Sequence, residues 1–185
     1  MSLRLFVALD LPPEARAALA AFRDAAADPQ AWRPLGDDSL HLTLAFLGHR
    51  PESDVERVAA VLQRPPGPAP RLALASALAL PPRRPRVLGA AIADPDGTLA
   101  RLQEGLGTAL ELAGTYEPEA RPFRPHVTVA RLRPGTKAPR TAVPPPAPLE
   151  FHGTAVTLYE SRLRRSGAGY EALSSVALSE PESRD

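Results

Sequence analysis

The sequence predicts an α+β fold in which strands and helices are interspersed and several strands pair as hairpins. Alternating apolar residues mark short strands, and apolar residues at the 3.6-residue period mark three helices among them. The frame His-x-Thr-x-Ala occurs twice, at His41 and at His126, in opposite halves of the chain. Each copy lies next to an amphipathic helix in the sequence. We therefore infer an internal duplication, in which two sheets, each with one motif strand, face each other and bring the two His-Thr pairs across a shared cleft.

Length and composition indicate an ordinary globular protein. The 185 residues suffice for one substantial core, and 44% of them are hydrophobic and 23% charged. Asp10 interrupts the N-terminal apolar run before it reaches the length of a signal-peptide core, and no segment approaches the roughly 20 apolar residues that cross a bilayer. We expect one domain at residues 1–178 and a flexible tail at 179–185, in a cytoplasmic monomer without membrane association.

The charged residues do not indicate which ligand the protein binds. The formal charge is only +1, so no overall positive field indicates a nucleic-acid partner. All but one of the 22 basic residues are arginines, which suit bidentate phosphate contacts. A GC-rich genome accounts for the same bias and for the many alanines and prolines, and we favour that explanation.

Turn residues and periodicity divide the first half of the chain into alternating elements. Pro12 and Pro13 fit the first turn of a helix, and Gly48 is expected to end the first motif strand. The predicted elements are a strand at residues 4–9, a helix at 14–27, a loop at 32–34, a strand at 40–47 and a helix that opens at 51–54.

The second half repeats this alternation after a proline-rich break. Leucines spaced three or four residues apart predict its helix. The predicted elements are strands at 72–75 and 86–92, a helix at 97–113, the second motif strand at 123–132, a proline-rich loop at 133–148, and strands at 151–158 and 170–178.

The repeated motif is the best candidate for chemistry. Side chains two residues apart on a strand point to the same face, so His41 lies with Thr43 and His126 with Thr128. A single such pair is more often a hydrogen-bonded surface feature, but its recurrence favours function. Two imidazoles in one pocket can act as general base and general acid, while hydroxyls stabilise an oxyanion. This set suits phosphoryl chemistry in which water attacks in line and an alkoxide leaves on the opposite side.

Other chemistries lack their usual residues. The chain has no cysteine and no Gly-x-Ser-x-Gly, which argues against disulfides, thiolate zinc sites and acyl transfer by a triad. Each motif brings one histidine and no nearby carboxylate, which argues against a closed zinc site. No phosphate-binding glycine loop follows a strand. We expect neither a metal nor an organic cofactor.

The two motifs and their surroundings resemble a known family. The paired frames resemble the signatures of the two-histidine (2H) phosphoesterase superfamily, and their context is similar to the bacterial and archaeal RNA 2′,3′-cyclic phosphodiesterases, once called 2′-5′ RNA ligases. The matching stretches are RLFVALDLPP from Arg4, HLTLAFLG from His41, RPFRPHVTVAR from Arg121 and LYES from Leu158. They cover almost the whole chain.

The resemblance implies a bilobed fold with pseudo-two-fold symmetry, in which two antiparallel sheets face each other across a central cleft with the helices on the outside. It also implies metal-independent hydrolysis of an RNA terminal 2′,3′-cyclic phosphate to a 2′-phosphate. It implies RNA ends or small cyclic nucleotides as partners. The implied roles are His41 as the general acid that protonates O3′, His126 as the general base that activates water, Thr43 and Thr128 as phosphate ligands, Arg131 as a positive charge at the phosphate, and Phe46 as a stacking surface for the terminal base. The two histidine roles are open to exchange, because the sequence does not orient the substrate.

Strict alternation conflicts with two of these roles. Phe46 and Arg131 each lie five residues after their histidine, so a regular strand sends them to the opposite face. Both reach the cleft only if each strand twists sharply, bulges or ends near Ala45 and Ala130. Otherwise Phe46 belongs to the core and Arg131 is an ordinary surface charge.

Several other residues are weaker candidates. His49 and His152 lack the motif frame, and we interpret both as non-catalytic. Trp32 could stack on a base, but packing is favoured. The arginines of the last turn either contact an RNA backbone or form a solvated hairpin tip; these are Arg162, Arg164 and Arg165.

Two alternatives to the hydrolase remain open. One is a non-catalytic module that binds RNA ends or nucleotides, although two intact motifs favour an enzyme. The other is reversible 2′-5′ ligation, or the hydrolysis of a different cyclic nucleotide.

Overall fold

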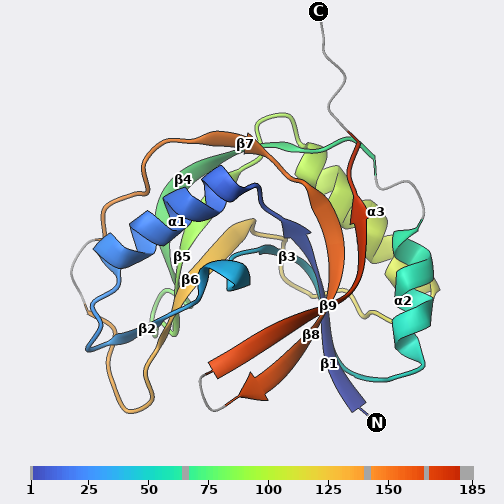
Figure 1. Cartoon of the computed structure of the whole chain (residues 1–185), viewed down its shortest axis with the longest axis horizontal. Coiled ribbons are helices and arrows are strands. Elements are labelled where there is room, and N and C mark those ends of the chain that lie inside the picture. Colours follow the sequence, from blue (N-terminus) through green and yellow to red (C-terminus); the bar gives the residue numbers. More distant parts are fainter. Residues whose placement is uncertain (1, 64–66, 140–142, 165–166, 180–185) are drawn as a thin grey trace, which may run out of the picture.

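Helices and strands follow one another along the chain largely as predicted (Figure 1). The computed structural model describes residues 2–63, 67–139, 143–164 and 167–179. The helices are α1 (Pro13–Ala26), α2 (Asp54–Leu62) and α3 (Thr98–Leu112), and a short 3-10 turn spans Asp37–Ser39. The strands are β1 (Ser2–Asp10), β2 (Trp32–Pro34), β3 (Leu42–Pro51), β4 (Arg71–Leu80), β5 (Val87–Ala93), β6 (His126–Leu132), β7 (Glu150–His152), β8 (Ala155–Arg164) and β9 (Gly167–Ala177).

The strands form two antiparallel halves that join at one residue pair. The order is β7-β4-β5-β6-β3-β1-β8-β9, with β2 added beside β6. We call β7, β4, β5, β6 and β2 the β6 half, and β3, β1, β8 and β9 the β1 half. Only Leu42 and Val127 pair across the junction between β3 and β6. The α+β class and the bilobed antiparallel arrangement are therefore confirmed, and the two sheets are continuous at this point.

The helices cross between the halves in a way that supports the predicted duplication. Helix α1 follows β1 but packs against β6, whereas α3 follows β5 but packs against β3. In both cases the strand before the helix pairs antiparallel with the motif strand that comes after it, β1 with β3 and β5 with β6. Figure 1 shows α1 over β4, β5 and β6, with α2 and α3 on the other side of the molecule. Each copy of the motif thus follows a helix that packs on the other half.

The core lies between the sheet and these helices. Helix α1 buries Ala15, Leu19 and Phe22, and α3 buries Leu99 and Leu110. A fully buried leucine contributes about 1.5–3 kcal/mol relative to an exposed one. None of the helices in the described ranges is long and apolar enough to cross a membrane.

Two predictions for the first half were wrong. Residues 32–34 were predicted as a loop, but they form β2, because Trp32 and its neighbours pair with the end of β6. Gly48 does not end β3, because the strand continues beside the beginning of β1 as far as Pro51. Both errors concern pairings between segments that are distant in sequence.

The predicted strand at 151–158 is two strands. β7 pairs with β4 in the β6 half, and β8 pairs with β1 in the β1 half, so the chain changes halves at Gly153. A Cβ at Gly153 would lie 2.7 Å from the Leu9 side chain, so only glycine fits this crossing without a shift. At the far end of the chain Ser179 still bonds to Ala69 through its backbone carbonyl. The rest of the predicted tail, residues 180–185, lies outside the described residues.

Candidate active site

The junction between the halves brings the two motifs together. Leu42 and Val127 each follow a motif histidine, and they pair antiparallel. Antiparallel register therefore places Thr43 beside His126, and His41 beside Thr128. Because opposed residues project from the same face of a sheet, this register sets each imidazole on the same face as the hydroxyl of the other motif. We call the sheet surface that carries these four side chains the motif face.

Both motif strands bulge at the same position. Between β1 and β3 the register skips Leu44, and between β5 and β6 it skips Val129, each three residues after its histidine. The burial of the two motifs is the same residue by residue, with two successive buried residues at the bulge followed by an exposed one. The extra residue restores Phe46 and Arg131 to the motif face. The bulge that these two roles required is therefore present in both copies.

The bulge in β6 also explains a glycine in the neighbouring strand. Gly89 lies opposite Thr128, and a Cβ there would lie 2.6 Å from the Val127 carbonyl oxygen. That separation is shorter than real Cβ atoms adopt against backbone, so a side chain at 89 would displace the strand that carries Thr128. The sequence contained no signal for this role, because the clash depends on the register.

His126 lies in an open pocket of about 740 Å³. Thr43 and Phe46 line the same pocket, which extends towards α3 and the 116–124 segment, whereas His41, Thr128 and Arg131 are outside its lining. The Nδ1 of His126 is 2.8 Å from the Arg124 carbonyl oxygen. Because a carbonyl only accepts, Nδ1 carries the proton, and the neutral ring keeps Nε2 as its basic atom.

His41 occupies a much more enclosed environment. Its ring stacks on Phe6 with the centroids 4.9 Å apart, lies 5.8 Å from the nearly parallel ring of Tyr159, and meets the edge of Tyr170 at 5.1 Å. Burial and the Arg131 charge lower the pKa of His41 to about 4, although its hydrogen bond to the Ser39 backbone opposes this shift. With this pKa the imidazole is neutral at pH 7.

The fifth position of each motif carries a different group on the same face. Phe46 is one of two exposed large hydrophobic residues among those described, with 42% of its surface accessible, and the Arg4 guanidinium lies 5.0 Å from its ring centroid. Arg131 is exposed at the end of β6 and is close enough to His41 to affect its pKa. The structure thus gives the site one aromatic side and one cationic side.

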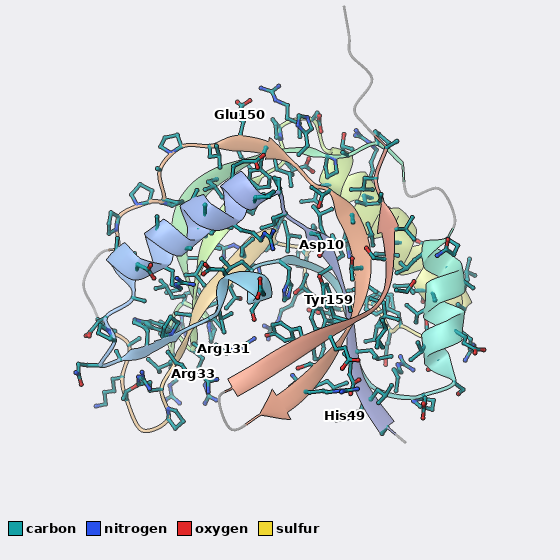
Figure 2. The ribbon with its side chains drawn as sticks, viewed as in Figure 1. Asp10, Arg33, His49, Arg131, Glu150 and Tyr159 are labelled. Atoms are coloured by element: carbon teal, nitrogen blue, oxygen red, sulfur yellow. The ribbon has the colours of Figure 1, made fainter. Side chains whose placement is uncertain are left out.

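A polar network behind His41 was not predicted. Asp10 accepts hydrogen bonds from the Thr157 hydroxyl at 2.6 Å and from the Tyr159 hydroxyl at 2.8 Å, and Thr157 also bonds to Ser175. Figure 2 shows Asp10 and Tyr159 near the centre of the molecule, where β1 and β8 run together. Burial and the bond to Asp10 raise the pKa of Tyr159. The hydrogen bond to Asp10 fixes the Tyr159 hydroxyl, and the Tyr159 ring lies nearly parallel to the His41 imidazole.

Sequence signals for this network were present but weak. Asp10 and Tyr159 lie in two of the stretches that resemble the family, ALDL and LYES. Neither stretch indicates that the two residues meet, because they are far apart in the chain and become neighbours only through the pairing of β1 with β8.

The weaker candidates lie away from this centre. His49 is exposed near the end of β3 (Figure 2), and His152 is exposed on β7. Trp32 is buried, so the packing interpretation is confirmed. Arg162 forms ion pairs with Glu160 and Glu171.

The other two arginines of the last turn, Arg164 and Arg165, are not placed by the structure: the first has no described side chain, and the second lies outside the described residues. In the described part of the chain no three His, Asp or Glu side chains are grouped as metal ligands.

Two antiparallel halves joined through paired His-x-Thr strands define the class of protein, a two-histidine phosphoesterase. The chain belongs to the 2′-5′ RNA ligase superfamily, whose family model matches residues 11–165. By family it is thus an enzyme that acts on phosphoric esters.

Two relatives match over nearly their whole length. The chain is 35% identical to a Thermus thermophilus protein named RNA 2′,3′-cyclic phosphodiesterase, over 95% of this chain and 90% of that protein. It is 33% identical to an Escherichia coli protein of the same name, over 96% of this chain and 97% of that protein.

Solved structures agree with this assignment. The crystal structure of E. coli LigT complexed with 3′-AMP matches with a TM-score of 0.83 and 31% identity, over 97% of this chain and all of that chain. The crystal structure of TT0787 of T. thermophilus matches with a TM-score of 0.81 and 35% identity, over 95% and 97% of the two chains.

Proposed function

We propose that the protein hydrolyses the terminal 2′,3′-cyclic phosphate of RNA to a 2′-phosphate, with the two motif histidines as acid and base. The observation that supports this proposal is the pairing of Leu42 with Val127, because each of these residues directly follows a motif histidine and their antiparallel register brings the two motifs side by side. The activity named for the two relatives agrees with it.

The reaction needs one proton removed and one proton supplied. Nε2 of His126 takes a proton from water as the water oxygen bonds to phosphorus. The bond from phosphorus to O3′ breaks on the opposite side, and O3′ takes a proton from Nε2 of His41. The products are a 2′-phosphate and a free 3′-hydroxyl. Each proton transfer of this kind is typically worth 10²–10⁴-fold in rate.

The hydroxyls and Arg131 stabilise the charge on the phosphate. Thr43 and Thr128 donate hydrogen bonds to the non-bridging oxygens, and the Arg131 guanidinium offsets the charge that develops during attack. Phe46 gives the terminal base a surface on which to stack, a contact typically worth about 1–3 kcal/mol.

The low pKa of His41 constrains the assignment of roles. A general acid must be protonated in the complex, whereas burial and, as the smaller cause, the Arg131 charge lower the pKa of His41 to about 4. The anionic phosphate binds between Arg131 and His41, offsets the guanidinium charge and raises the pKa of the imidazole. Substrate binding therefore supplies the protonated form. The exchanged assignment, with His41 as base and His126 as acid, needs no such change at His41.

The product identifies which bond breaks. An RNA that ends in a 2′,3′-cyclic phosphate is incubated with the protein in EDTA, and the position of the remaining phosphate is read by NMR. We expect a 2′-phosphate and undiminished turnover. A 3′-phosphate would overturn the proposed leaving group, and no turnover would overturn the proposed hydrolase.

A substrate with a good leaving group separates acid from base. A p-nitrophenyl phosphodiester releases a phenolate that needs no proton, so loss of the general acid should cost little with this substrate. We expect His41→Ala to retain much of the wild-type rate on it and His126→Ala to lose most of it. The reverse order would assign the base to His41.

A further inference from the structure

A second arginine lies directly beside Arg131. In the pairing of β2 with β6, Arg33 is opposite Arg131, and both residues are exposed. Opposed residues of an antiparallel pair project from the same face of the sheet, with their Cβ atoms about 5 Å apart. Arg33 therefore shares the motif face with Arg131, and Figure 2 shows the two arginines side by side.

This pairing is unfavourable in the absence of an anion. Like charges directly opposite each other destabilise a sheet. No ion pair of either guanidinium is found within the described residues. Two of the carboxylates near Arg33 in sequence are engaged elsewhere: Asp37 pairs with Arg23 at 2.7 Å, and Asp28 accepts a bond from the Gln30 amide at 2.9 Å.

The backbone holds Arg33 in place. Trp32 is 4% exposed, and its amide donates to the Asp28 carbonyl at 2.8 Å. On the other side, the Leu35 amide donates to the Val129 carbonyl at 2.9 Å, which attaches the segment to the bulge of β6. The backbone of Arg33 is therefore fixed beside Arg131, and only the side chain has to be ordered when a ligand binds.

From this geometry we infer a second anion subsite at Arg33, directly beside Arg131, that binds the phosphodiester on the 5′ side of the terminal nucleotide. The inference rests on the proposed function and specifies its substrate class.

The last nucleotide of an RNA carries two anions, the cyclic phosphate and the 5′-phosphodiester, on opposite sides of one ribose. Arg131, whose charge reaches His41, meets the first, and Arg33 on the adjoining strand meets the second. Planar guanidinium groups suit both phosphates. The preferred substrate is therefore an RNA end rather than a free nucleoside cyclic phosphate.

Binding of product analogues tests the subsite without turnover. Calorimetry compares adenosine 2′-monophosphate with adenosine 2′,5′-bisphosphate. We expect wild type to bind the bisphosphate roughly tenfold tighter, and Arg33→Gln to remove that preference while the affinity for the monophosphate stays unchanged. Arg84→Ala, a change at an exposed arginine outside the pocket lining, is the matched control and should keep the wild-type preference.

A second variant, in which the charge at Arg33 is reversed, tests the subsite without disturbing the fold. Arg33→Glu places opposite charges on the paired strands, so the fold is favoured, and it should bind the bisphosphate more weakly than the monophosphate. If Arg33→Gln weakens both probes equally, or changes neither, the 5′ subsite is wrong.

Turnover distinguishes this failure from failure of the proposed function. Wild type should hydrolyse a dinucleotide 2′,3′-cyclic phosphate with higher kcat/KM than the nucleoside cyclic phosphate, and Arg33→Gln should bring the two values together. If wild type hydrolyses both substrates and Arg33→Gln leaves the ratio of their kcat/KM values unchanged, the subsite is wrong but the proposed hydrolase stands. Preference for the bisphosphate without any turnover would support the subsite and overturn the hydrolase.

Discussion

The two copies of the motif have the same backbone but different surroundings. Both strands bulge three residues after the histidine, and the backbone two residues earlier acts on each imidazole: the Arg124 carbonyl lies 2.8 Å from Nδ1 of His126, and the Ser39 backbone favours the protonated form of His41. His41 is nevertheless enclosed by three aromatic rings, whereas His126 lines an open pocket. Duplication supplied two equivalent groups, and the packing around them made them inequivalent. Acid and base roles are commonly divided between titratable groups in this way.

The largest effect is expected from removing either histidine. If both act in proton transfer, His41→Ala and His126→Ala should each lower kcat for cyclic-phosphate hydrolysis by about 10²–10⁴-fold. The double variant should lose little more than the worse single variant, because the two groups act in one step. Steady-state assays with His49→Ala as the control measure this, and an active single variant would contradict the shared site.

The enclosure of His41 should make the protein sensitive to acid. The pKa of His41 is about 4 in the folded state against 6.5 for the unperturbed group, so the unfolded state binds more protons between these values. Stability should be unaffected by His41 above pH 6.5 and should fall as pH decreases towards 4. Each pKa unit of difference between the folded and unfolded states corresponds to about 1.4 kcal/mol, so the loss in free energy of unfolding that His41 causes is limited to about 3 kcal/mol.

Urea unfolding at pH 7 and at pH 4.5 measures this loss. In His41→Asn the part of the decline that belongs to His41 should be absent. An equal decline in wild type and variant would show that the ring is not enclosed in solution.

The aromatic side of the site should affect substrate binding more than chemistry. Phe46→Ala removes a stacking surface typically worth about 1–3 kcal/mol, so KM should rise by roughly 5- to 150-fold with little change in kcat. Leu112→Ala is the control, because Leu112 is 83% exposed on α3. An unchanged KM in Phe46→Ala would mean that the base binds elsewhere.

The smallest effect is expected from removing the hydrogen bond between Tyr159 and Asp10, next to His41. Tyr159→Phe keeps the ring but removes its hydrogen bond to Asp10, which should cost about 1 kcal/mol of stability. Because the ring then loses its tether, the His41 resonances in an NMR titration should broaden or shift. Tyr170→Phe, which changes another ring in contact with His41, is the comparison; the same response in both variants would show that Asp10 does not position Tyr159.

Local patterns predicted much of the molecule. The alternation around His41 and His126 identified both motif strands, and periodic leucines located α3 to within a residue at each end. These signals are readable because side-chain direction in a strand or helix depends on neighbouring residues alone. The same rule showed that Phe46 and Arg131 could reach the motif face only through a break in alternation, but it did not say whether a break occurs.

The errors arose where the outcome depends on a distant partner. Residues 32–34 carry no strand signal of their own and become β2 only because the end of β6 offers an unpaired edge. In the same way, residues 151–158 read as one strand, but their two ends pair with different halves.

By itself the sequence determined that there are two equivalent His-Thr pairs, which strands carry them, and that the fold is α+β. Tertiary structure alone decided that Leu42 pairs with Val127, that both strands bulge, and that one imidazole is enclosed while the other is open. Register, bulging and desolvation depend on contacts between segments far apart in the chain, and it is desolvation by such contacts that lowers the pKa of His41.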